Sequence, residues 1–242
     1  MRVVDVKNLT FSYDGGKTLL SDISFYVSAG EVFVIAGLSG CGKTTLCRII
    51  CGIIPHAVKG NISGEISVMG VDPADVSLPQ ASLSAGMVFQ DEDSQIVCTT
   101  VEDELAFGLE NHCVPSDEIR SRVDELLTEF GLSELKLENP SKLSGGQKKL
   151  LNIASVLALS PPVLILDEPF SGLDEEGRIL VREAIERQRN LGRAVMIVEH
   201  DLKQAAFADR WLLLHDGVIA INDTPSVILE RENLLKELNL RP

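Results

Sequence analysis

The sequence predicts an α/β fold with a mostly parallel core sheet, an antiparallel β subdomain and an inserted α-helical subdomain. Three short apolar runs, within 32–37, 163–169 and 194–200, have the length and composition of strands buried on both faces. Helix-like segments separate these runs, and strands joined through helices form a right-handed, mostly parallel sheet. Segments with strict alternation flank the first run, which favours antiparallel strands beside the main sheet.

Antiparallel strands are expected on both sides of the first core strand. The segments 2–13, 19–31 and 64–70 alternate between apolar and polar residues, as a strand does when one face is buried. Between them, the strand at 32–37 runs into a glycine-rich turn and then into a helical pattern over 44–53. Strand, turn and helix therefore form one unit.

The second half of the chain is expected to begin with a helical block from 100 to about 158, with breaks at Pro115-Ser116 and Asn139-Pro140. A further helix is expected to begin at about Glu175, after the second core strand. The tail has an apolar stripe with roughly helical spacing, expected to pack on the core or on another subunit: Val227, Ile228, Leu234, Leu235, Leu238 and Leu240. We expect a single domain over 1–242, with a core and β subdomain at approximately 1–90 and 160–225, a helical subdomain at approximately 95–158, and a C-terminal helix at approximately 225–242.

The composition disfavours several classes of function. A formal net charge of −14 is opposite to the clustered Lys and Arg that bind phosphate backbones, so no nucleic-acid partner is expected. No apolar run is long enough to span a bilayer, and the first residues lack the apolar core of a secretion signal. The chain is therefore expected to stay in the cytosol and to reach a membrane only through a partner. Five cysteines without the spacing of a disulfide framework are expected to be reduced thiols.

A phosphate-binding loop is predicted by the segment GLSGCGKTT, in which Gly37, Gly40, Gly42, Lys43 and Thr44 match G-x-x-x-x-G-K-[ST]. The glycines let backbone N–H groups close around phosphates at a helix N-terminus, Lys43 places a charge on the β and γ phosphates, and Thr44 offers its hydroxyl to Mg²⁺. Because a strand precedes the motif and a helix follows it, the sequence predicts nucleotide binding here.

A second anion site is predicted by LSGGQ, from Leu143 to Gln147. A hydroxyl and two glycines stand before a helical run, which is the composition of an anion site at a helix N-terminus. One small chain with two such sites raises the question of why both are present.

Two carboxylates end the second core strand. Asp167 and Glu168 follow VLIL and are therefore expected at the carboxyl edge of the sheet, where open α/β sheets bind their ligands. Asp167 can hold Mg²⁺, and Glu168 can polarise a water for attack on the γ phosphate. A solvated Asp-Glu turn is the alternative. His200 closes the third core strand in the same way, although a lone histidine is more often structural.

Two further residues carry less information by themselves. Gln90 ends GMVFQ and opens a polar loop, where an exposed side chain is the default interpretation. Tyr13, in FSYDGG, is able to stack on an adenine ring or to be an ordinary surface aromatic.

Taken in order, these segments resemble the ATP-binding-cassette (ABC) ATPases over nearly the whole chain. Tyr13, GLSGCGKT, Gln90, LSGGQ, VLILDE, SGLD (171–174) and His200 correspond to the A-loop, Walker A, Q-loop, signature, Walker B, D-loop and switch histidine. The resemblance implies a P-loop NTPase fold and a head-to-tail pair of cassettes, in which each nucleotide lies between the P-loop of one chain and the signature of the other.

The resemblance also implies the roles of individual residues. It implies catalytic roles for Lys43, Gln90, Glu168 and His200, and Mg²⁺ ligation by Thr44, Gln90 and Asp167. It implies that ATP is bound by Tyr13, Gly37, Ser39, Gly40, Cys41, Gly42, Lys43, Thr44 and Thr45 and, across the pair, by Ser144, Gly145, Gly146 and Gln147.

A finer resemblance lies in VEDELAFGLEN (101–111), which is similar to the energy-coupling-factor (ECF) subgroup of importers for vitamins or for cobalt and nickel ions. By its chemistry alone the segment is an acidic amphipathic helix. The chain departs from the subgroup at Asp91-Glu92, where Asn-Pro is common, and at Leu150, where many relatives have Arg. It also ends soon after ELNLRP, whereas many of these subunits run on by some tens of residues.

The resemblance implies an ATPase subunit of an ECF-type importer. Its partners would be a second cassette, identical or different, a transmembrane coupling protein and a substrate-binding membrane protein, and it would sit at the cytoplasmic face of the membrane. Two alternatives remain open. One is a soluble cassette ATPase, as in Fe-S assembly or DNA maintenance, although the latter carries coiled-coil insertions and no heptad block occurs here. The other is a non-hydrolysing cassette that only completes a partner's site.

Overall fold

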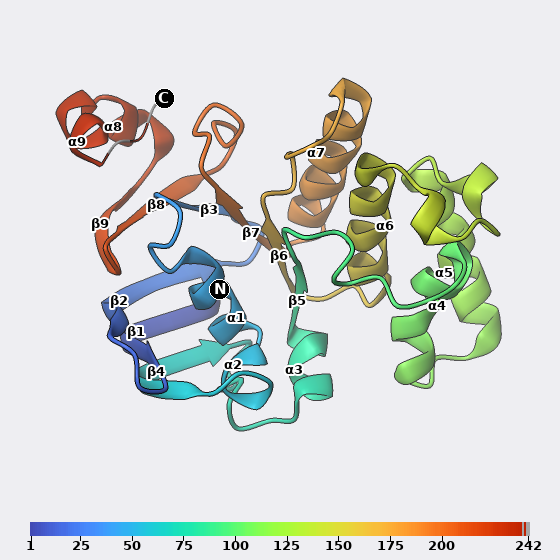
Figure 1. Cartoon of the computed structure of the whole chain (residues 1–242), viewed down its shortest axis with the longest axis horizontal. Coiled ribbons are helices and arrows are strands. Elements are labelled where there is room, and N and C mark those ends of the chain that lie inside the picture. Colours follow the sequence, from blue (N-terminus) through green and yellow to red (C-terminus); the bar gives the residue numbers. More distant parts are fainter. Residues whose placement is uncertain (239, 241–242) are drawn as a thin grey trace.

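A computed structural model describes residues 1–238 and 240 of the chain, and Figure 1 shows its two sheets on one side and a group of helices on the other. The main sheet has the order β5-β6-β7-β3-β8-β9. Its strands are β3 (Val32–Ala36), β5 (Ala85–Val88), β6 (Val163–Asp167), β7 (Ala194–Glu199), β8 (Arg210–His215) and β9 (Val218–Asp223). All pairs are parallel except β8 with β9. The predicted parallel core is confirmed.

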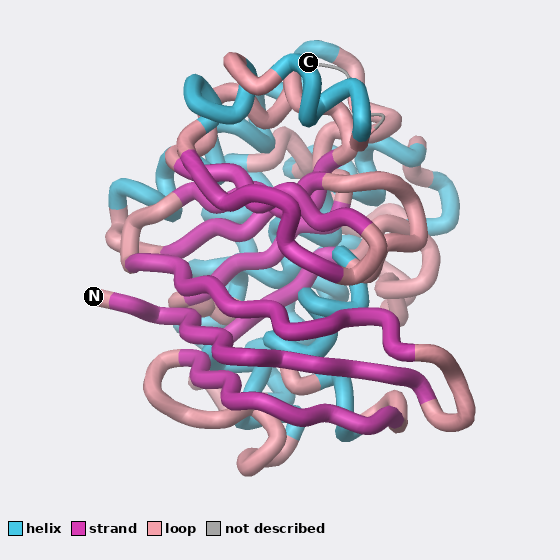
Figure 2. Tube along the Cα trace, turned by 90° about the vertical axis from the view of Figure 1, so that its left-hand side faces the viewer, coloured by secondary structure: helices cyan, strands magenta, loops and turns pink. Residues whose placement is uncertain are grey.

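The antiparallel sheet has the order β2-β1-β4 and is formed by β1 (Arg2–Tyr13), β2 (Thr18–Ser28) and β4 (Gly60–Val68). These strands overlap the three alternating segments of the sequence, although β4 begins four residues before the expected segment, and both of their pairings are antiparallel. Figure 2 shows the strands gathered on this side of the molecule, with the helices behind them.

The core sheet is buried on both faces, and the alternation of its side chains separates two hydrophobic clusters. In β3, Phe33 and Ile35 pack with the antiparallel sheet and α1 (Lys43–Ile50), whereas Val32 and Val34 pack with the helices of the opposite face. Because each face is fully covered, the strand reads as one continuous apolar run.

The helical subdomain occupies the side of the molecule opposite the antiparallel sheet (Figure 1). It contains α4 (Val101–Asn111), α5 (Ser116–Glu129), the 3-10 turns η1 (Ser133–Leu135) and η2 (Pro140–Lys142), and α6 (Gly145–Ala158). The breaks fall where the sequence placed them, since α5 begins directly after Pro115 and η2 begins at Pro140. Helix α7 (Glu175–Asn190) packs against α6 and β7 and links this subdomain to the core.

Short elements complete the chain: α2 (Ile53–His56), α3 (Leu78–Ser84), α8 (Pro225–Leu229) and α9 (Glu232–Glu237). The tail was expected as one helix, and the structure divides it into α8 and α9. Ile228, Leu235, Leu238 and Leu240 of the predicted stripe are buried in the cluster that includes Val32, so the tail packs on the chain's own core. Residues 239, 241 and 242 of the expected helix lie outside the described residues. Over the described residues, no helix has the length and apolarity needed to cross a bilayer.

Candidate active site

The loop between β3 and α1 closes around the side chain of Lys43. Gly42 has φ 107°, a left-handed conformation, and a Cβ there would lie 2.6 Å from Cδ2 of Leu20. Only glycine therefore fits this turn without strain. Lys43 begins α1, and its Nζ donates to the carbonyl oxygens of Gly37 at 2.8 Å and Leu38 at 2.9 Å. The lysine is 8% exposed, so its charge is held inside the loop.

Thr44 and Asp167 meet at the carboxyl edge of the sheet. Thr44 Oγ1 donates to Asp167 Oδ2 at 2.7 Å, and Asp167 is the buried last residue of β6. Burial raises the pKa of Asp167, the hydroxyl of Thr44 lowers it and the charge of Glu168 raises it. A hydroxyl and a carboxylate are oxygen ligands of the kind that Mg²⁺ prefers, so the residues present fit this ion.

Glu168 receives two polar side chains from neighbouring strand ends. Gln90, two residues after β5, donates from Nε2 to Glu168 Oε2 at 3.0 Å. His200, directly after β7, has Nδ1 at 3.6 Å from Glu168 Oε1, and its side chain is 61% exposed. Since the amide nitrogen of Gln90 bonds the carboxylate, its amide oxygen is the atom left for a metal. Two residues far apart in sequence thus converge on the carboxylate of Glu168.

The backbone of Glu168 is in an unusual conformation. Its φ is 52°, in the left-handed region that residues other than glycine enter at a cost of about 1 to 3 kcal/mol. Its N–H donates to the carbonyl of Val198 at 3.0 Å, and its carbonyl accepts from the N–H of Ser171 at 3.3 Å. Such outliers persist where surrounding contacts hold them, and they gather at functional sites.

Tyr13 lies beside the first turn of α1. Its hydroxyl is 3.0 Å from Thr45 Oγ1, and its ring packs edge-on against Phe11 with centroids 4.9 Å apart. These contacts fix the ring near the phosphate-binding loop. Stacking on adenine stays a prediction.

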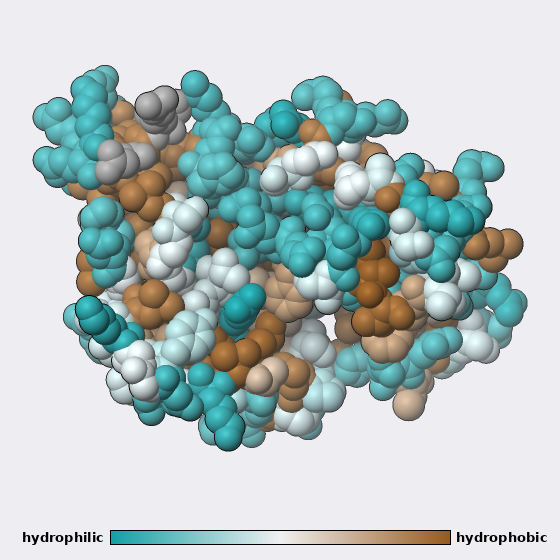
Figure 3. Space-filling model, viewed as in Figure 1, coloured by the Kyte–Doolittle hydropathy of each residue, from teal (hydrophilic) through white to brown (hydrophobic). Residues whose placement is uncertain are grey.

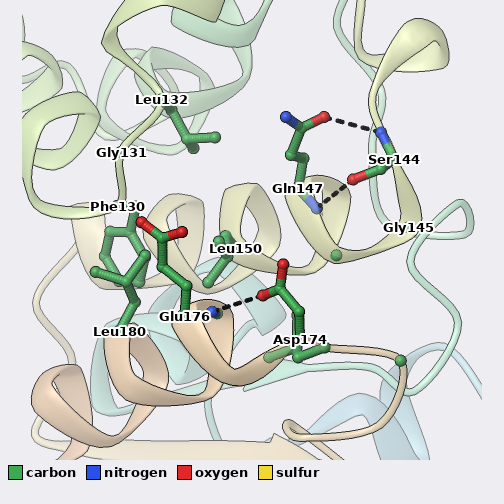
Figure 4. A pocket seen from close by; sticks show the side chains of 14 residues that line it. Phe130, Gly131, Leu132, Ser144, Gly145, Gln147, Leu150, Asp174, Glu176 and Leu180 are labelled. Carbon is green, nitrogen blue, oxygen red and sulfur yellow. Dashed lines mark hydrogen bonds between the residues drawn. The ribbon is translucent and has the colours of Figure 1, made fainter.

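The LSGGQ segment forms the N-terminus of α6 (Figure 4). Ser144 is the N-cap residue: its Oγ accepts from the N–H of Gln147 at 3.2 Å, while Gln147 Oε1 accepts from the N–H of Ser144 at 2.9 Å. This reciprocal capping leaves the N–H groups of Gly145 and Gly146 without a partner inside the helix. They line a cavity of about 470 Å³ together with residues 172–174 of the SGLD segment.

The residues predicted to hold Mg²⁺ and the LSGGQ residues line different cavities. Thr44, Gln90 and Asp167 line one, and Ser144 to Gln147 line the other. Within the part of the chain that the structure describes, these two cavities share no lining residue. The structure therefore brings Lys43, Thr44, Gln90, Asp167, Glu168 and His200 to one region, and leaves the LSGGQ residues apart from it.

Two buried charged residues beside the site were missed by the sequence interpretation. Glu199 is the last residue of β7, is 2% exposed and has one carboxylate oxygen, Oε1, with no hydrogen-bond partner in the described residues. Lys149 of α6 is also 2% exposed. The position of Glu199 at a strand end beside His200 was a usable signal. For Lys149 there was none, since a lysine on a helix is ordinarily solvated.

A pH dependence of stability follows from Glu199. Burial raises the pKa of Glu199 to about 7 from 4.5. Because the folded chain then holds this proton more tightly than the unfolded chain, the stability that Glu199 contributes is full below about pH 4.5 and is lost as the pH rises through about 7. Glu199→Gln is expected to raise the free energy of unfolding over the wild type by up to about 3 kcal/mol near pH 8 and by little near pH 5. Urea unfolding at both pH values measures this, and a difference independent of pH would contradict it.

Comparison with known proteins identifies the family. Residues 20–171 match the family model described as "ABC transporter". The chain is 39% identical over 243 residues to the energy-coupling factor transporter ATP-binding protein EcfA1 of Levilactobacillus brevis, covering 98% of this chain and 84% of the relative. It is 38% identical to a putative ABC transporter ATP-binding protein of Methanosarcina mazei. The match covers 99% of this chain and 42% of the length of that relative.

Solved structures agree with these relatives. The structure of cbiO1 from Clostridium perfringens, described as part of the ABC transporter complex cbiONQ, superposes with a TM-score of 0.83 at 34% identity, covering 99% of this chain and 95% of that one. An ATP binding subunit of an ABC transporter superposes with a TM-score of 0.85 at 27% identity, covering 98% of each chain. The chain therefore belongs to the ABC transporter family and is an ATPase subunit of its energy-coupling-factor type.

Proposed function

We propose that this chain hydrolyses ATP with Mg²⁺ to drive an importer of a vitamin or a transition-metal ion, as a peripheral subunit at the cytoplasmic face of the membrane. The observation that carries the proposal is the convergence of Gln90 and His200 on the carboxylate of Glu168, at the sheet edge that holds Lys43, Thr44 and Asp167. A non-hydrolysing cassette would not need this arrangement, since none of the residues assigned to ATP binding is Glu168 or His200.

The residues have distinct roles in this proposal. Lys43 and the N–H groups of residues 37–45 bind the phosphates, and Tyr13 stacks on the adenine. Glu168 orients and polarises the attacking water, Gln90 and His200 hold its carboxylate, and His200 is exposed enough to reach the γ phosphate. When bound to Thr44, Asp167 and Gln90, Mg²⁺ neutralises charge on the β and γ phosphates.

A second cassette would complete the site. The N–H groups of Gly145 and Gly146 lie at the positive end of α6 and are directed to a cavity that contains no P-loop residue among those described. Two chains arranged head to tail would place this helix end against the γ phosphate that the other chain's loop holds.

The proposed function also divides the chain into an ATP-binding core (approximately 1–90 and 160–225), a helical subdomain (approximately 95–158) and a C-terminal segment.

The membrane partner is proposed to dock in a groove of about 340 Å³ between the core and the helical subdomain. Residues of α3 and β5 form one side, and α4 and α6 form the other. Phe107 of α4 and Val97 line this groove, and they are 45% and 64% exposed, so the groove presents large apolar side chains to solvent. In Figure 3, hydrophobic surface lies on both sides of the hollow between the two halves of the molecule. An amphipathic helix on the cytoplasmic side of a membrane-spanning protein has the matching chemistry.

Copurification tests this proposal. Phe107→Glu puts a charge into the groove, so it is expected to abolish copurification of a multi-spanning membrane protein with the tagged chain, while basal ATP hydrolysis stays within about twofold. Leu191→Glu, at an exposed leucine after α7 and outside the groove, is the matched control and is expected to retain the partner. Copurification of a soluble scaffold in place of a membrane protein would contradict the transport function.

A further inference from the structure

Lys149 of the signature helix α6 has an environment that its sequence position does not indicate. A lysine is almost never fully buried unless its charge is paired. Lys149 is 2% exposed, and its Nζ lies 3.0 Å from Glu92 Oε1, 3.1 Å from the carbonyl oxygen of Glu168 and 3.0 Å from that of Ser171. The two carbonyls accept hydrogen bonds from the ammonium group, and Glu92 pairs with its charge.

At one end, Lys149 binds the loop that follows Gln90. Its partner Glu92 is 28% exposed at the side chain, and the backbone carbonyl of Glu92 accepts from Asn152 Nδ2 at 2.9 Å. The loop is therefore held to α6 by two side chains one helical turn apart.

At the other end, Lys149 binds the backbone that carries the catalytic carboxylate. The carbonyl of Glu168 belongs to the residue in the left-handed conformation, and Ser171 closes that turn through its N–H. A charged donor on both carbonyls stabilises the turn more than a neutral donor would. The direction of the Glu168 side chain follows from this backbone conformation, and so does its contact with Gln90.

We propose that Lys149 is a positioning residue for ATP hydrolysis, which links the loop after Gln90, through Glu92, to the backbone of Glu168 and Ser171. It holds the carboxylate of Glu168 where it orients the attacking water. A change in the conformation of the loop reaches Glu168 by two routes, through the Gln90 side chain and through the Glu92–Lys149 ion pair. The inference rests on the proposed role of Glu168.

The adjacent ion pair supplies a matched control. Lys148 Nζ lies 2.6 Å from Asp93 Oδ1, and therefore joins the same helix to the same loop. The Asp93 side chain is 76% exposed, and no hydrogen bond connects Lys148 to Glu168 or Ser171 within the described residues. Lys148→Met removes a lysine charge that pairs with the same loop, and it leaves the Glu168 turn untouched.

The test compares steady-state kinetics of Lys149→Met, Lys148→Met and the double variant Glu92→Gln/Lys149→Met. Misplacing a catalytic group by about 1 Å costs up to about 10²-fold, so Lys149→Met is expected to lower kcat about 10- to 100-fold with KM and ATP affinity within about twofold. Lys148→Met is expected to stay within about twofold of wild-type kcat.

The double variant separates two causes of a low kcat: loss of the contacts by which Lys149 positions Glu168, and the unpaired charge that Lys149→Met leaves on Glu92. It leaves no unpaired charge on Glu92, so it is expected to resist urea better than Lys149→Met does, and to remain less stable than the wild type because the carbonyl of Ser171 still loses its donor. We expect its kcat to be as low as that of Lys149→Met, with KM unchanged. Wild-type kcat in the double variant, or a loss in which KM rises as much as kcat falls, would overturn the inference. Glu168→Gln is measured beside it: if that variant keeps its turnover, the proposed function fails instead.

Discussion

Glu168→Gln is expected to lower kcat for ATP hydrolysis by about 10² to 10⁴ while leaving ATP affinity near the wild-type value. The amide has the shape of the carboxylate and is able to accept the hydrogen bond from Gln90, so the local structure should persist. It has no charge with which to polarise a water, and the loss is therefore confined to the chemical step. Phosphate release under steady state measures kcat, and a fluorescent ATP analogue measures affinity.

Glu175→Gln is the control for this prediction. Glu175 is exposed in the first turn of α7 and lies outside both cavities among the described residues. Its substitution removes a carboxylate that interacts with the helix dipole, which is worth about 0.3 to 1 kcal/mol of stability, and turnover should stay within about twofold. Unchanged turnover in Glu168→Gln would show that Glu168 is not the water-orienting base. The contacts of Gln90 and His200 with its carboxylate would then have no catalytic role.

The core strands were predictable because their signal is local. β3, β6 and β7 are buried on both faces, and each therefore reads as a short apolar run between helical segments. β8 and β9 were not predicted. The run from Trp211 to Leu214 is short, and its strand is fixed by pairing with β3, far away in sequence. The Asp216-Gly217 turn between two strand-like segments was the signal that could have found this hairpin.

The residues of the site were predictable from the sequence, but the contacts between their side chains were not. The phosphate-binding loop is a local motif, and the positions of Asp167, Glu168 and His200 follow from the rule that parallel strands end at one edge. Distances between side chains do not follow from that rule. The contact of Gln90 with Glu168 depends on the path of a polar loop, and the burial of Lys149 depends on an acid from that loop. A helical pattern does not indicate that Lys149 is buried, because the loop with Glu92 and the turn from Glu168 to Ser171 that contact it are distant in sequence.

Ser144→Arg is expected to lower turnover by about 10²-fold. A loss of this size is typical when one hydrogen-bond donor that stabilises charge in the transition state is removed. The Arg side chain fills the space before Gly145 and Gly146, where a phosphate would be bound across the pair. The variant also loses the cap on α6, which costs about 0.5 to 2 kcal/mol of stability. Ser144→Ala loses the same cap without the added bulk, so it should bind ATP and retain more turnover.

Mixing Ser144→Arg with Glu168→Gln tests whether the second anion site belongs to another chain. If two copies pair head to tail, a mixed dimer contains one site with both substitutions and one site with neither. Equal amounts of the two inactive proteins should then recover roughly a quarter of wild-type turnover, since half of the dimers are mixed and each has one intact site. No recovery would show that copies of this chain do not complete each other's site. Normal turnover by a Ser144→Arg dimer alone would show that LSGGQ takes no part in hydrolysis. Recovered turnover would show that the two anion sites of one chain belong to two different active sites. Because these sites are separate within one chain, each can face the complementary site of the other chain.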